Sequence, residues 1–71
     1  MYILIEMQTN GEQTAIPPII TRTEWHEAEA EFHRLCSVAA TSSVPVHTVM
    51  LVDEHGISVR PAEYYTHGGA D

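Results

Sequence analysis

Histidine and cysteine are the residues of this sequence with the most direct potential for chemistry. Five histidines and a single cysteine occur among 71 residues. His33 and Cys36 are three positions apart, so on a helix an imidazole could activate the thiol. Cys36 also falls on the apolar stripe of the helix expected there, and a buried helical cysteine is usually inert packing. We therefore do not expect a catalytic thiol.

A metal site and an acid–base pair are the other chemistries that the histidines could support. His26, Glu29 and His33 share a helix flank, but no further strong ligand is nearby in sequence. A solvated polar flank explains them better. His33 and His47 could act as acid and base in a small hydrolase, although only the histidine count supports this. The sequence contains no glycine-rich phosphate loop, no His-Glu-x-x-His motif and no nucleophile elbow. We predict a non-enzymatic protein without metal or cofactor.

A small polar ligand could bind at a subunit interface. His47 lies within an apolar strand, where a histidine is either bonded inside the core or placed at an interface. Tyrosine hydroxyls, imidazoles and an arginine could together hold a signalling nucleotide. Alternatively, the tyrosines cap the sheet edge. The candidate ligand-binding residues are His33, His47, Arg60, Tyr64 and Tyr65.

The charge balance is strongly acidic. Ten acidic residues stand against three arginines and no lysine, which gives a net charge of −7. A nucleic-acid-binding surface needs clustered lysine and arginine, so direct nucleic-acid binding is disfavoured. The charge serves either solubility or the binding of a basic protein partner. Three glutamates form one stripe of the expected helix and are the candidate partner-binding residues: Glu24, Glu27 and Glu31.

The length allows one domain, predicted over residues 1–67, with a flexible tail over 68–71. A chain this short is close to the lower limit for independent stability, so self-association is a natural supplement. One cysteine excludes an internal disulfide and fits a reducing cytosol. Neither a signal peptide nor a membrane-spanning run is apparent. We predict a soluble, cytoplasmic protein.

The first third of the chain predicts a β-hairpin followed by a helix start. Residues 2–8 are apolar and β-rich, an Asn-Gly turn of type I′ follows, and residues 13–16 return as an edge strand that ends at Pro17-Pro18. Thr21 and Glu24 match a capping box, with Ile20 and Trp25 as its hydrophobic staple. Apolar residues then recur at helical spacing. The helix is predicted over residues 22–40.

The last third predicts a second hairpin. Residues 46–52 form an apolar strand, residues 53–56 a turn with Gly56 in the left-handed region, and residues 57–60 the returning strand. Whether residues 63–66 resume that strand stays open. The predicted fold class is α+β, with a four-stranded antiparallel sheet in a β-β-α-β-β order and one helix on one face.

The two long strands are apolar on both sides, which exceeds what one helix can cover. Ile3, Ile5 and Met7 are placed toward the helix, so that the neighbouring side chains point away from it. The far face would then be an apolar patch covered by a second copy, unless loops and tail fold over it. We predict a homodimer or higher oligomer, with an interface formed by Tyr2, Leu4, Val49 and Leu51.

Four segments of the chain carry a resemblance to known proteins: Met1-Tyr2, residues 5–10, residues 29–33 and residues 39–47. In these segments the sequence resembles a group of small acidic proteins from phages and prophages of gut Firmicutes. No active site comes with this group. The resemblance implies a bacterial cytoplasm and an accessory protein that binds and disables a host component.

Two functions are consistent with these observations. The first is an inhibitor that engages a basic host protein, for example one of antiviral defence, through its acidic surface. The second is an oligomer that sequesters a signalling nucleotide at a subunit interface. Ionic strength separates them, since an acidic surface loses its partner as salt rises.

Overall fold

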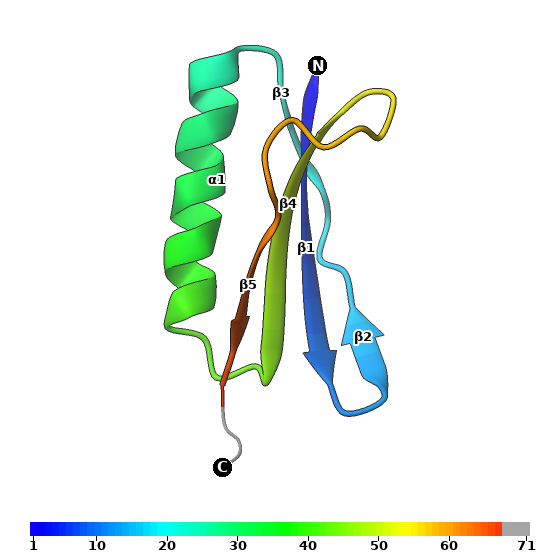
Figure 1. The fold of residues 1–71 in the computed structure, drawn as a ribbon, viewed down its shortest axis with the longest axis vertical. Coiled ribbons are helices and arrows are strands. Elements are labelled where there is room, and N and C mark those ends of the chain that lie inside the picture. The colour runs from blue at the N-terminus through cyan, green and yellow to red at the C-terminus, as the bar shows by residue number, and fades with distance from the viewer. Residues whose placement is uncertain (68–71) are drawn as a thin grey trace.

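The computed structural model describes residues 1–67, which form an antiparallel sheet of five strands with one helix on one side (Figure 1). The α+β class is confirmed, although the sheet has one strand more than the four predicted. The predicted tail, residues 68–71, lies outside the described residues. The elements in chain order are β1 (Tyr2–Asn10), β2 (Gln13–Ala15), β3 (Ile20–Arg22), α1 (Trp25–Ala40), β4 (Val46–Asp53) and β5 (Glu63–Thr66).

β1 and β4 form the centre of the sheet and pair from Tyr2↔Asp53 to Thr9↔Val46. The order across the sheet is β2-β1-β4-β5, and β3 lies on the same edge of β1 as β2. β2 and β3 therefore act as one interrupted edge strand. Between them, residues 16–19 run opposite only residues 5–7 of β1, so this edge bulges at its two prolines.

The turn between β1 and β2 differs in type from the prediction. Asn10 pairs with Gln13, so the central residues of the turn are Gly11 and Glu12. Only Gly11 has a positive φ, of 67°. This is the pattern of a type II′ turn, which places glycine first, rather than the predicted type I′ turn.

The helix begins later than predicted, because β3 includes the predicted N-cap, Thr21, and the first predicted helical residue, Arg22. Thr21 is in β3 and pairs with Ile3, so it cannot be the N-cap. Glu24 is the N-cap and makes no side-chain capping bond. Pairing with β1 satisfies backbone groups that a frayed first helical turn would leave open. The predicted end of the helix, Ala40, is confirmed.

The core lies between α1 and the sheet. Ala28, Phe32, Leu35, Cys36 and Ala39 form the buried stripe of the helix. They pack on side chains of β1 and β4, of which Leu4, Val49 and Leu51 are at most 1% exposed. The steps of three and four residues along the helix explain this one-sided burial.

The chain between β4 and β5 is mostly irregular. The predicted turn is present, with Gly56 at φ 80°. Of the predicted return strand, only an isolated bridge forms, Val52↔Ser58. Pro61 cannot donate to a ladder, and the regular pairing resumes only in β5.

Candidate functional site: the open face of the sheet

Register decides which side chains of β1 and β4 point toward the helix. Residues directly opposite each other in an antiparallel pair share a face. The pairs Leu4↔Leu51 and Glu6↔Val49 lie on the helix side, because Leu4, Val49 and Leu51 are buried in the core. The alternate residues of both strands must point to the other side.

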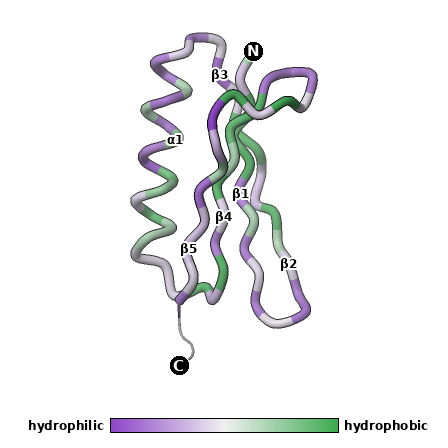
Figure 2. Tube along the Cα trace, viewed as in Figure 1, coloured by the Kyte–Doolittle hydropathy of each residue, from purple (hydrophilic) through white to green (hydrophobic). Residues whose placement is uncertain are grey.

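The opposite side of the sheet is an apolar surface, which we call the open face. Its central pairs are Ile3↔Val52 and Ile5↔Met50. The helix lies on the other side of the sheet (Figure 1), and hydrophobic residues concentrate along β1 and β4 (Figure 2). Its side chains all remain partly exposed. On the two central strands, the open face consists of Ile3, Ile5, Met7, Thr9, Val46, Thr48, Met50 and Val52.

The charged side chains of the strands do not lie on the exposed face of the sheet, where solubility would favour them. The strands of residues 1–67 contain four charged residues, counting Asp, Glu and Arg. All four pair with helix-side residues, namely Tyr2 or Val49. A sheet with one solvated face normally directs its charges to solvent. Here they point toward the helix layer and the uncovered face has none: the four are Glu6, Arg22, Asp53 and Glu63.

This geometry corrects the predicted oligomer interface. Leu4, Val49 and Leu51 lie under the helix, and Tyr2 packs against the same core. Tyr2 also contacts Trp25 of α1, with ring centroids 5.5 Å apart. These four residues therefore belong to the helix side. The apolar surplus predicted for the far face exists, but the other alternating set of residues forms it.

A hydrogen bond explains why the more polar set can face the helix. His47 is 2% exposed, and its Nε2 lies 2.8 Å from Oε2 of Glu6. The pair satisfies two polar groups that the helix covers. The Nδ1 atom of His47 is buried and has no protein partner within residues 1–67. The sequence left His47 either bonded inside the core or placed at an interface, and the structure places it inside the core.

The acidic helix stripe is less available than its sequence suggests. Glu31 is only 14% exposed and accepts a hydrogen bond from Nε of Arg34 at 2.7 Å. Arg22 also approaches it, at 3.4 Å. The bond from Arg34 is the main reason that the pKa of Glu31 lies below its usual value. Glu24 and Glu27 are exposed and form no ion pair within the described residues.

The other residues that could support chemistry are either buried or not close to one another. Cys36 is buried in the core, and burial raises the pKa of its thiol, which opposes thiolate formation. His33 is exposed on the helix, whereas His47 is buried on β4, so they do not form an acid–base pair. Within residues 1–67, no group of three or more His, Cys, Asp or Glu side chains could hold a metal ion.

The predicted ligand-binding residues are only partly brought together. His47 and Tyr65 pair across β4 and β5 on the helix side. Tyr64 points to the opposite face and is 69% exposed, and His33 is on the exposed surface of the helix. These residues do not line one pocket of a single chain.

Arg60, the fifth of the predicted ligand-binding residues, contacts residues of α1. Its guanidinium lies 4.5 Å from the ring centroid of Phe32, and its Nη1 donates to Glu29 at 3.2 Å. The Nε atom is buried and has no hydrogen-bond partner among residues 1–67. Through these contacts, Arg60 holds the irregular β4–β5 connection against α1.

Comparisons with known proteins found no family model, no curated protein and no solved structure that matches the chain. No helix in residues 1–67 is both long and apolar enough to cross a membrane.

Proposed function

We propose that this chain is a non-catalytic protein-binding module that acts as a homodimer, with the open faces of two sheets packed together. One observation carries the proposal: the uncovered side of the sheet is apolar and uncharged, while the charged side chains of the strands lie on the helix side. An apolar face of this kind is unfavourable in water and needs a covering layer.

The charge distribution favours a second copy as that layer. Two chains of net charge −7 repel each other. Packing open face to open face puts the acidic helices on the two outer surfaces, on the order of 30 Å apart. That exceeds the Debye length of about 8 Å at physiological salt, so repulsion between the helices is largely screened.

The size of the open face favours a dimer of moderate affinity. The β1–β4 pairing spans roughly 26 Å at about 3.3 Å per residue, and four strands span about 19 Å. Two such faces bury on the order of 1,000 Å², the lower range for specific interfaces. We expect a dissociation constant of about 1–100 µM.

Sedimentation equilibrium of the full chain tests this proposal. Above the dissociation constant, the measured mass should be about twice the monomer mass of 7.9 kDa. Raising NaCl from about 0.02 M to about 0.5 M should tighten the dimer, since salt screens the repulsion and leaves the apolar contact intact. A chain that stays monomeric at about 0.5 mM in both salts contradicts the proposal.

We propose that a basic protein partner binds to the outer surface of the dimer. Glu24 and Glu27 support this part of the proposal, because both are exposed at the start of α1 and no arginine neutralises them. Glu31 contributes little, since its carboxylate is bound by arginines. Inhibition of a host protein is the specific form of this function implied by the resemblance to phage proteins.

Charge reversal tests the role of the helix. Binding to immobilised polylysine should fall at least about tenfold more for Glu24→Lys/Glu27→Lys than for Glu12→Lys/Glu63→Lys, which changes the net charge equally. Binding of the native chain should weaken as salt rises. Equal losses in the two double variants would mean that net charge alone drives the interaction, and would contradict a helix site.

A further inference from the structure

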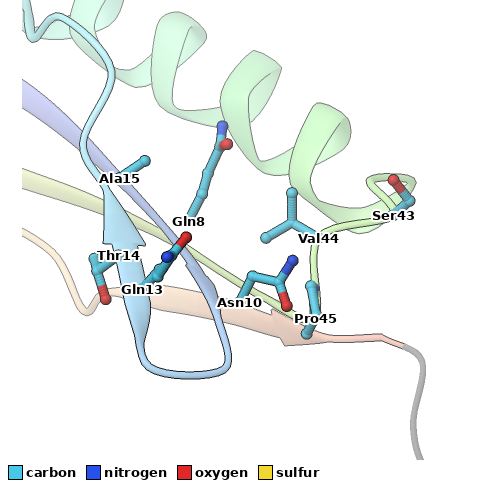
Figure 3. A pocket seen from close by; sticks show the side chains of 8 residues that line it. All are labelled: Gln8, Asn10, Gln13, Thr14, Ala15, Ser43, Val44 and Pro45. Atoms are coloured by element: carbon cyan, nitrogen blue, oxygen red, sulfur yellow. The ribbon is translucent and has the colours of Figure 1, made fainter.

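A cleft of about 350 Å³ lies on the helix side of the sheet, beyond the end of α1. It is bounded by the β1–β2 hairpin and by the chain that leads from α1 to β4 (Figure 3). The helix contacts β1, β3, β4 and β5 but not β2, which leaves this corner of the sheet uncovered. Its lining residues are Gln8, Asn10, Gln13, Thr14, Ala15, Ser43, Val44 and Pro45.

Side-chain amides dominate the chemistry of this cleft. The sequence contains one asparagine and two glutamines, and all three line it: Asn10, Gln8 and Gln13. Register brings them to one face, because Gln8 pairs with helix-side His47 and Asn10 pairs with Gln13. Within residues 1–67, none of the three amides bonds to another protein group.

The lining also determines which ligands are disfavoured. It contains no ionisable side chain, and hence no cation to hold a phosphate or carboxylate. The chain as a whole repels anions. Each primary amide presents a donor and an acceptor side by side, which matches another amide edge or the edge of a nucleobase. Figure 3 shows Asn10 directed toward the apolar wall of Val44 and Pro45.

We propose that this cleft binds a small, uncharged ligand with an amide-type donor–acceptor edge, as nucleobases and terminal carboxamides have. Its volume lies at the lower end of the range for small-molecule sites. The proposal is independent of the homodimer, because the cleft and the open face are on opposite sides of the sheet. A phosphorylated nucleotide binds less well than its nucleoside.

The test is a titration of the ¹⁵N-labelled full chain followed by NMR. Only three side-chain amide groups exist in the sequence, so their NH₂ signals report directly on the cleft. The probes are adenosine, uridine, N-acetylglycinamide and AMP. We expect saturable shifts of all three NH₂ pairs with at least one neutral probe, at a Kd of about 0.1–1 mM. Comparison of the nucleosides with N-acetylglycinamide distinguishes a nucleobase from a simple amide.

Matched variants decide whether the carboxamides are responsible. Gln8→Glu and Gln13→Glu keep the side-chain shape but remove the amide donor, and each should weaken binding at least tenfold. Thr23→Glu adds the same charge at an exposed position outside the cleft and should leave binding unchanged. The proposal is overturned if no neutral probe shifts the NH₂ signals at about 5 mM, if the Gln variants bind normally, or if AMP binds more tightly than adenosine.

Discussion

Ile5→Glu should convert the dimer into a folded monomer. Ile5 pairs with Met50 at the centre of the open face and is not part of the core beneath the helix. In the dimer, the two-fold axis would bring both new carboxylates into an apolar interface without a cation. An unpaired buried charge costs several kcal/mol, so self-association should weaken at least about 100-fold. Light scattering after size-exclusion chromatography measures the change in mass.

Ile57→Glu is the matched control for this substitution. Ile57 is 63% exposed in the β4–β5 connection and is not part of the open face. The same exchange at this position adds the same charge without affecting the proposed interface, and the dimer should persist. A dimer that withstands Ile5→Glu, or that Ile57→Glu disrupts equally, would show that the open face is not the contact surface.

Phe32→Ala should produce the largest loss of stability. Phe32 is 1% exposed and fills the space between α1 and the sheet, with the Arg60 guanidinium over its ring. Truncation of a buried phenylalanine costs about 3–5 kcal/mol. A chain of this length has a free energy of unfolding of about 4–10 kcal/mol. We therefore expect the free energy of unfolding to fall by about 3–5 kcal/mol, measured by urea titration of Trp25 fluorescence.

Val38→Ala controls for a general effect on the helix. Val38 is in α1 but is 47% exposed. Alanine has the higher helix propensity, so this variant should change the free energy of unfolding by less than about 0.7 kcal/mol. If Phe32→Ala were equally mild, the helix–sheet core described here would be incorrect.

The main parts of the fold follow from local patterns in the sequence. Apolar residues at helical spacing locate α1, and proline and glycine locate the turns and the broken edge. β3 was missed because Ile20 and Thr21 also fit a capping signal for the helix. Only their pairing with Leu4 and Ile3 makes the strand more favourable. Those contacts join residues far apart in sequence.

The orientation of β1 could not be fixed by hydrophobicity. Both alternating sets of its residues contain large apolar side chains, so either set could face a helix. Ile3, Ile5 and Met7 are the more apolar choice, yet Leu4 and Glu6 face the helix in the structure. The Glu6–His47 hydrogen bond, which compensates for the burial of two polar groups on the helix side, links two strands and is not visible in either strand alone.

The cleft and the charge arrangement could be recognised only from the structure. Gln8, Asn10 and Gln13 are within six residues of one another, which is a signal in hindsight. Their convergence depends on hairpin register and on where the helix ends. Likewise, the glutamate stripe of α1 was visible as a pattern. The Arg34–Glu31 pair is an i,i+3 contact within the helix, whereas the approach of Arg22 to Glu31 could not be seen without the packing of β3 beside the helix.

Solvent accessibility of the methionine methyl groups is a direct test of the homodimer through the open face. Met7 and Met50 are on the open face, and Met1, 56% exposed, is an internal reference. With methyl-labelled methionine, a soluble gadolinium chelate should relax Met1 strongly and the other two weakly at about 1 mM protein. In Ile5→Glu, relaxation of Met7 and Met50 should rise severalfold. If their relaxation in the native chain already equals that of the Ile5→Glu variant, no second copy covers the open face and the homodimer is contradicted.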